Sequence, residues 1–208
     1  MTMATIDAVP TERVRGRGGG GPASTRTVVA YGFWIFILSD ITMFSGLFAA
    51  YAVLSGRTAG GPNGSELFNL RHVFIETMCL LVSSYTCGLG ALSAERRQPD
   101  RFYVFAALTF VLGAAFLFIE ISEFAGMVSR GAGPSRSAFL SAFFTLVGMH
   151  GAHVTSGLLW LAYMVAQVVA KGLRPNVLRR LLCFSLFWHA LDIIWIGVIT
   201  VVYLMGAR

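Results

Sequence analysis

Residues 138–170 read AFLSAFFTLVGMHGAHVTSGLLWLAYMVAQVVA, and this stretch decides the fold class. It contains no Lys, Arg, Asp or Glu, because the flanking charges are Arg136 and Lys171. A helix crosses about 30 Å of hydrocarbon with roughly 20 predominantly apolar residues. The stretch is therefore long enough to span a bilayer, with length to spare for tilt.

Four more segments of the same kind lie on either side of this one, each interrupted by no more than two acidic residues and by no Lys or Arg. The chain has 208 residues, of which 56% are hydrophobic and only 12% charged, and this balance excludes an ordinary soluble domain. We expect an all-α polytopic membrane protein, a bundle of five transmembrane helices. The predicted spans are about 28–54, 72–94, 102–128, 138–169 and 181–205.

The basic residues are confined to the termini and the connections between spans. With five spans, eleven of the sixteen Lys and Arg residues lie on one side and five on the other. The positive-inside rule therefore predicts a cytoplasmic N-terminus and a periplasmic C-terminus. Residues 1–27, which include an Arg-Gly run without an apolar centre, are expected to form a disordered cytoplasmic tail ahead of the transmembrane domain at 28–208, not a signal peptide. The positive charge does not indicate nucleic-acid binding.

Ionisable residues inside the spans are the candidate functional positions, because each costs a few kcal/mol unless it faces protein or water. In three of the helices they form pairs spaced i, i+3, so each pair projects from one helix face. The predicted intramembrane polar network consists of Asp40, Glu76, Glu120, Glu123, His150, His153, His189 and Asp192.

Three roles suit this network: interhelical hydrogen bonding that fixes packing, proton handling, or metal binding. Di-metal bundles use paired Glu-x-x-His motifs, whereas this chain offers Glu-x-x-Glu and His-x-x-His on different helices. We therefore predict no metal site and no catalytic residue in this chain. At similar depth, His189 and His150 are the expected hydrogen-bond partners of Asp40.

Small residues recur every fourth position on two of the predicted helices, which allows neighbouring backbones to approach closely. The predicted packing residues are Ser83, Cys87 and Ala91 on one helix, and Gly148, Ala152 and Ser156 on another. All three cysteines lie in apolar segments, which favours buried thiols over disulfides or metal ligands.

Four runs within the spans resemble subunit III of haem-copper oxidases, and the resemblance extends from about Tyr31 to the C-terminus. The five spans and the ending Val201 to Met205 are most similar to the cytochrome o ubiquinol oxidase branch. The runs are Tyr31-Gly-Phe-Trp34 to Ser39-Asp40, Phe139-Leu-Ser-Ala-Phe-Phe144, Gly148-Met-His-Gly-Ala-His-Val154 and Phe187-Trp-His-Ala-Leu-Asp-Ile-Ile-Trp195.

The resemblance implies an accessory subunit of a bacterial terminal oxidase in the inner membrane. Such a complex oxidises ubiquinol, reduces oxygen to water and pumps protons, so the enzyme is the complex and this chain holds no redox centre. The resemblance places the haems and copper in subunit I. It implies that this chain docks on subunit I, accompanies subunits II and IV, binds phospholipid between helices, and supports assembly and sustained turnover. Asp40 matches a buried carboxylate of the family.

Two other functions remain open from the sequence. One is a self-standing membrane metalloenzyme with Glu and His ligands, and the other is subunit III of a cytochrome c oxidase. A transporter is disfavoured because the chain shows no internal repeat and no matching pair of Gly- or Pro-broken helices.

Overall fold

The computed structural model describes residues 25–60 and 70–206. Within these ranges the chain forms long helices and no strand. The elements are α1 (Thr25–Leu54), α3 (Leu70–Glu95), α4 (Pro99–Ser129), α5 (Ala138–Lys171), α6 (Pro175–Val198) and the π-helix η1 (Ile199–Leu204), which continues α6.

The predicted fold class is confirmed, because five helices in the described ranges are long and apolar enough to cross a membrane. Most helices extend a few residues past the predicted spans, and α6 begins six residues earlier, at Pro175. Helical hydrogen bonding does not stop where the hydrocarbon ends, so the polar flanks remain helical. Of the predicted tail, residues 1–24 lie outside the described residues and 25–27 belong to α1.

Local sequence signals set several helix ends. Proline occupies the first turn of both α4 and α6, where its missing N–H would have no helical partner. The Ser137 hydroxyl caps α5 by accepting a hydrogen bond from the Leu140 amide at 3.2 Å. Gly172 ends α5 with φ of 69°, a conformation that other residues rarely adopt. The connection from α5 to α6 is consequently only three residues long.

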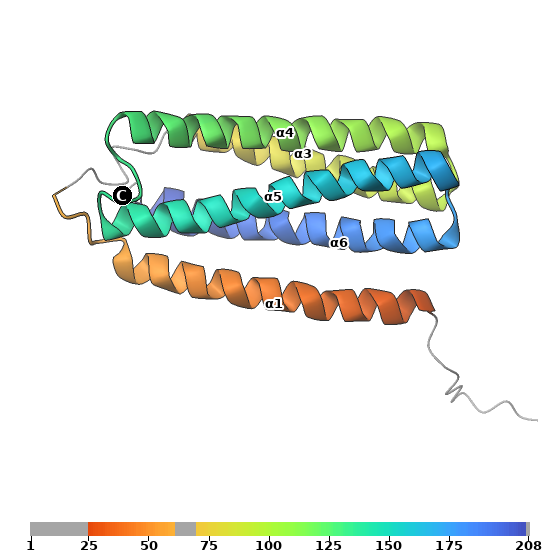
Figure 1. The fold of residues 1–208 in the computed structure, drawn as a ribbon, viewed down its shortest axis with the longest axis horizontal. Coiled ribbons are helices and arrows are strands. Elements are labelled where there is room, and N and C mark those ends of the chain that lie inside the picture. The colour runs from red at the N-terminus through yellow and green to blue at the C-terminus, as the bar shows by residue number, and fades with distance from the viewer. Residues whose placement is uncertain (1–24, 61–69, 207–208) are drawn as a thin grey trace, which may run out of the picture.

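The helices run roughly alongside one another (Figure 1). The strongest pairing is between α3 and α4, and α5 and α6 pack against each other and against this hairpin. Helix α1 packs mainly on α5 and α6, at one side of the bundle. Four helices thus enclose the main core, and α1 is attached to it along one side.

Helix α1 contacts the rest of the bundle through a narrow seam. Its buried residues, Ile37, Phe44 and Tyr51, recur every seven positions. Phe33 joins the same seam with an edge-to-face contact to Trp160, the two ring centroids being 5.8 Å apart. Most of the other side chains of α1 are exposed, and many of these are apolar. A single seven-residue repeat is typical of a helix that packs along one stripe.

Candidate functional site

Three of the predicted polar residues are buried inside the bundle, in the half nearer the C-terminal end of α4. Glu76 of α3 and His150 of α5 are fully buried, and Glu120 of α4 is 3% exposed. Both Glu76 oxygens, both His150 nitrogens and one Glu120 oxygen have no hydrogen-bond partner within the described residues. We call these three residues the inner cluster. Groups of this kind are costly in hydrocarbon, so the bundle must hold them by packing, by shared protons or by water.

Aromatic rings enclose His150 on several sides. Its ring stacks on Trp195 of α6 at 5.1 Å between centroids, and Phe116 of α4 meets it edge-on at 5.8 Å. Phe116 and Trp195 also contact each other at 4.7 Å, and Phe44 of α1 approaches the imidazole at 6.4 Å. Four helices therefore meet at this one histidine, which explains how its side chain is positioned.

Glycine at position 151 makes room for the carboxyl group of Glu120. A Cβ atom built on Gly151 would lie 2.9 Å from Oε1 and 3.1 Å from Oε2 of Glu120. The sequence analysis did not single out Gly151. In the sequence, the one indication of its role is its position next to His150. Because glycine has no side chain, the Glu120 carboxyl group can lie against it. Gly151 thus fixes where α4 and α5 approach each other.

Glu123 lies one turn beyond Glu120 and is half-buried. It is close enough to Glu76 and Glu120 to interact electrostatically, and it also interacts with His72 and Arg130 near the same end of the bundle. A line of carboxyl groups therefore runs from the inner cluster toward the ends of α3 and α4. This arrangement suits proton holding or helix packing.

Asp40 and His153 occupy the seam between α1 and α5. Phe44 contacts the His153 ring at 5.2 Å, and Asp40, one turn earlier on α1, is half-buried. The His153 Nδ1 lies 2.8 Å from the Met149 carbonyl oxygen, which can only accept a hydrogen bond. Within the described residues no hydrogen bond or ion pair joins Asp40 to His150 or His189, the partners expected from the sequence.

His189 and Asp192 take a different position from the other pairs. His189 is exposed on α6, although it lies in the middle of a span, and Asp192 is half-buried beside it. Asp192 faces Ser84 of α3 and interacts electrostatically with His189. The His189 Nε2 would lie 3.8 Å from a Cβ built on Gly88. This pair therefore lies at the α3 edge of the outer α6 surface, away from the inner cluster.

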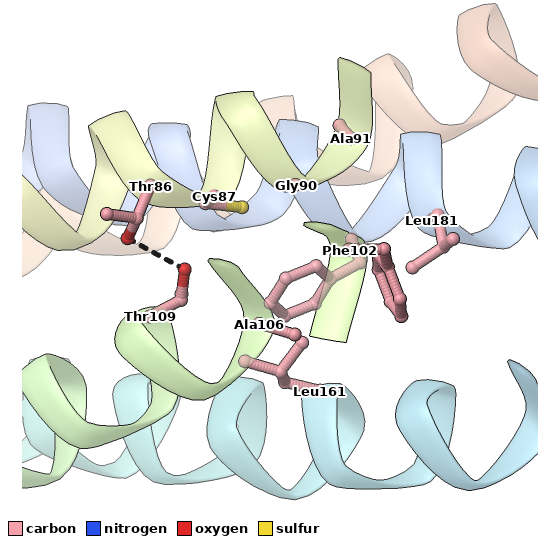
Figure 2. A pocket seen from close by; sticks show the side chains of 10 residues that line it. Thr86, Cys87, Gly90, Ala91, Phe102, Ala106, Thr109, Leu161 and Leu181 are labelled. Atoms are coloured by element: carbon pink, nitrogen blue, oxygen red, sulfur yellow. Dashed lines mark hydrogen bonds between the residues drawn. The ribbon is translucent and has the colours of Figure 1, made fainter. Parts of the chain in front are cut away.

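The small residues of α3 face the bundle. Ser83 and Cys87 are buried and Ala91 is partly buried. The Trp188 indole donates to Ser83 Oγ at 3.1 Å, and Ser83 Oγ donates to the Thr109 carbonyl oxygen at 3.2 Å, so one hydroxyl links three helices. Figure 2 shows Cys87 and Ala91 beside a cavity of about 20 Å³, next to the hydrogen bond between Thr86 and Thr109. This is room for about one water molecule.

The small residues of α5 that the sequence singled out lie differently. Gly148 is partly buried, with Phe124 3.8 Å from a Cβ built on it, whereas Ala152 and Ser156 are exposed. The close approach occurs instead at Gly157, where a built Cβ would lie 2.8 Å from Cζ3 of Trp188. Position 157 is one residue beyond the stripe chosen from the sequence. Ala152 and Ser156 remain available on the outer face of α5.

The geometry offers no metal centre in the part of the chain that the structure describes. There, no group of three or more His, Cys, Asp or Glu side chains is placed to hold a metal ion. The inner cluster contains two carboxyl groups and one imidazole, but the His150 ring packs against the aromatic rings of Phe116 and Trp195. The described residues therefore give no support to the metalloenzyme alternative.

Known proteins resemble this chain over most of its length. The family model described as cytochrome c oxidase subunit III matches residues 17–207. The cytochrome bo(3) ubiquinol oxidase subunit 3 of Pseudomonas aeruginosa is 53% identical over 177 residues, which is 85% of each chain. The quinol oxidase subunit 3 of Bacillus subtilis is 45% identical and covers 84% of this chain and 86% of its own.

A third relative carries a different name. The cytochrome c oxidase subunit 3 of Bacillus sp. strain PS3 is 41% identical over 175 residues, 84% of each chain. All three relatives are named as subunit 3 of an oxidase, so the resemblance predicted from the sequence motifs is confirmed. The chain belongs to the cytochrome c oxidase subunit III family.

Proposed function

We propose that this chain is the accessory, non-redox subunit III of a bacterial terminal oxidase that oxidises ubiquinol, reduces oxygen to water and pumps protons. The observation that carries the proposal is the 53% identity, over 85% of both chains, to a protein named as a ubiquinol oxidase subunit. The five apolar helices, with no metal-binding group in the described ranges, suit a membrane subunit that leaves redox chemistry to its partners.

The test is co-purification of the tagged chain from the native membrane in mild detergent. We expect it to bring down a haem-bearing subunit I together with subunits II and IV, in equal amounts. The purified complex should oxidise ubiquinol and not reduced cytochrome c. Oxidation of cytochrome c instead would favour the second candidate, subunit III of a cytochrome c oxidase, which the 41% identical relative supports. Purification of the chain alone would contradict both.

Within the complex, the chain stabilises subunit I and holds phospholipid. A groove of about 460 Å³ between α1, α5 and α6 supports the lipid role, because apolar rings line it and cationic side chains stand at one end. Phe33 and Trp160 provide the apolar wall, and Arg179 and Arg180 the charge. This combination fits an acyl chain and an anionic headgroup. Lipid that co-purifies with the complex should decrease when both arginines are changed to Gln.

The distribution of basic residues supports one orientation in the membrane. Among the described residues, eight basic side chains, including Arg26, Arg96, Arg101 and Arg180, lie at or near the end of the bundle where α1 begins, and four lie at or near the opposite end. We propose that this basic end faces the cytoplasm and that the C-terminus faces the periplasm of a bacterial inner membrane.

Single cysteines test this orientation in a variant that lacks the three native ones. Cysteines near Arg97 and Arg174 should react with a membrane-impermeant reagent only from the cytoplasm, and those near Asn63 and Arg136 only from outside. Reaction of positions 63 and 97 from the same side would remove the second span and contradict the five-span topology.

The metalloenzyme alternative makes an opposite prediction about metal content. If the chain is an accessory subunit, changing His150 and His153 to Ala leaves the iron and copper content per assembled complex unchanged. If it is a metalloenzyme, the isolated chain contains stoichiometric metal that the double variant loses. Elemental analysis of the two preparations separates these outcomes.

A further inference from the structure

The outer surface of α6 between α1 and α3 carries a polar group at a depth where hydrocarbon is the only solvent. His189 is exposed there, fourteen residues from the start of α6 at Pro175. At 1.5 Å per residue this is roughly 20 Å from the helix end, whereas the hydrocarbon core is about 15 Å thick on each side of its midplane. Lipid headgroups therefore do not reach His189.

The hydrogen bond made by Nδ1 of His189 determines whether its second ring nitrogen, Nε2, is a donor or an acceptor. Nδ1 lies 2.6 Å from the Ser185 carbonyl oxygen, and since a carbonyl oxygen only accepts, Nδ1 carries the proton. In the neutral ring Nε2 then carries no proton and can only accept a hydrogen bond. On α3, a Cβ built on Gly88 would lie 3.8 Å from Nε2, and this neighbour has no side chain to donate a hydrogen bond.

Asp192, one turn further along α6, does not share this exposure. Its Oδ1 is buried and has no hydrogen-bond partner within the described residues, and its carboxyl group faces Ser84 of α3. The exposed imidazole at mid-span is therefore the polar group that is expensive against lipid chains. Polar groups at such positions hydrogen-bond across helices.

The surroundings of this surface suit a close helix contact. Gly88 lies at its α3 edge and has no side chain there. Ile193 and Ile196, one and two turns beyond His189, are 70% and 48% exposed. We call the surface made by His189, Ile193 and Ile196 the α6 outer face. This face combines apolar area with one hydrogen-bond acceptor, Nε2 of His189. It therefore matches an apolar helix that carries one hydrogen-bond donor.

We infer that the α6 outer face is covered, in the assembled oxidase, by a transmembrane helix of another subunit that donates a hydrogen bond to Nε2 of His189 from a hydroxyl, amide or indole group. The inference rests on the proposed function, because it requires a partner subunit. It goes further by assigning the contact surface and the chemistry of the partner side chain.

Photo-crosslinking from two matched positions tests the contact in the full complex. A benzoylphenylalanine replaces Ile193 on the α6 outer face in one variant and Phe118 of α4 in the other. Phe118 is 74% exposed and lies at a similar depth in its span, so the two probes differ mainly in the surface they report. We expect position 193 to capture an oxidase subunit and position 118 to capture lipid.

Substitution of His189 tests the hydrogen bond itself. His189→Leu should reduce the amount of this chain retained per haem during detergent purification by about threefold or more, since it removes an interhelical hydrogen bond. His189→Gln keeps an acceptor and should restore most of the retention. A merely structural role for the ring would not distinguish a polar replacement from an apolar one of similar size.

The outcomes are separable from those for the proposed function. Failure of the unsubstituted chain to co-purify with any oxidase subunit would contradict the proposed function. If that complex forms, capture of lipid alone from position 193, or equal protein capture from 193 and 118, overturns the α6 contact. Full retention of His189→Leu overturns the hydrogen bond and indicates that water or lipid covers the histidine.

Discussion

Helices α1 and α6 are neighbours of equal span length, yet they contribute very differently to the bundle. Both spans cover 30 residues, with α6 counted through η1. Of the residues in an 18-residue apolar stretch of each span, 11% are buried in α1 and 44% in α6. Trp188 and Trp195 of α6 are almost completely buried. In α1, by contrast, the buried residues are those that recur at every seventh position along the seam. An apolar sequence commits both helices to the membrane, and the positions of glycines and large aromatic residues decide which helix is enclosed.

Two glycine substitutions test this difference and should give the largest effects. A Cβ on Gly157 would overlap Trp188 at 2.8 Å and Phe187 at 3.2 Å, while a Cβ on Gly46 of α1 would meet no described atom within 4 Å. We expect Gly157→Ala to lower the free energy of unfolding by about 1–3 kcal/mol because it overpacks the α5 to α6 contact. Gly46→Ala should be neutral or stabilising by up to about 1 kcal/mol.

Unfolding in mixed detergent, followed by the circular dichroism of the helices, measures both variants. Equal stabilities would mean that α5 and α6 adjust freely, and that the enclosure of α6 does not depend on close backbone approach.

The hydroxyl of Ser83 tests a second feature that α6 has and α1 lacks. It accepts from the buried Trp188 indole and donates to the Thr109 carbonyl oxygen. Ser83→Ala leaves the indole N–H without a partner, so we expect a loss of about 1–2 kcal/mol, more than for an ordinary hydrogen bond. Ser45→Ala on α1 is the control, because that exposed hydroxyl bonds only within its own helix. A smaller loss for Ser83→Ala than for the control would contradict the assignment.

The number of spans, and the presence of carboxyl groups within them, could be predicted from the sequence because both depend on the pattern of apolar and charged residues along the chain. The rotation of each helix about its axis could not. Gly148, Ala152 and Ser156 form a regular stripe, but α5 turns Gly151 and Gly157 inward, and it does so because Glu120 and Trp188 fit there. Such fits involve pairs of residues from different helices, which a single sequence does not display.

The same limitation affects the histidines. The pairs at 150 and 153 and at 189 and 192 look alike in sequence, yet His150 is enclosed by three aromatic rings and His189 is exposed. The π-helix η1 was also not predicted, since its residues are as apolar as those of a regular helix. Spacing within a helix identifies a shared face, but only the neighbouring helices determine what that face contacts.

Asp40 is the polar residue of the α1 seam, and its replacement should have an intermediate effect. We expect Asp40→Leu to weaken the association of this chain with the oxidase about 3- to 15-fold, the equivalent of one interhelical hydrogen bond in a membrane. The haem spectrum and the initial rate of quinol oxidation of assembled complexes should be nearly unchanged, while activity declines sooner during turnover. The control is Ser39→Ala, whose exposed hydroxyl bonds within α1.

Haem content, subunit stoichiometry and oxygen consumption over time, measured on one preparation, check this expectation. A fully assembled Asp40→Leu complex that is inactive from the first second would place Asp40 on an obligatory proton path and contradict an accessory role.

The smallest effect should come from a hydrogen bond that ties α1 to η1, at the end of α6. The Tyr51 hydroxyl donates to the Val202 carbonyl oxygen at 3.4 Å, a long contact to a carbonyl within η1. Tyr51→Phe keeps the ring that packs on Phe139, with centroids 6.1 Å apart, and removes only this bond. We expect a loss below about 0.6 kcal/mol, the average for such bonds in membranes. Tyr51→Ala should cost several times more, because it also empties the seam. If Tyr51→Phe and Tyr51→Ala destabilise equally in the unfolding assay used for the glycine variants, the hydrogen bond holds α1 and apolar packing along the seam does not.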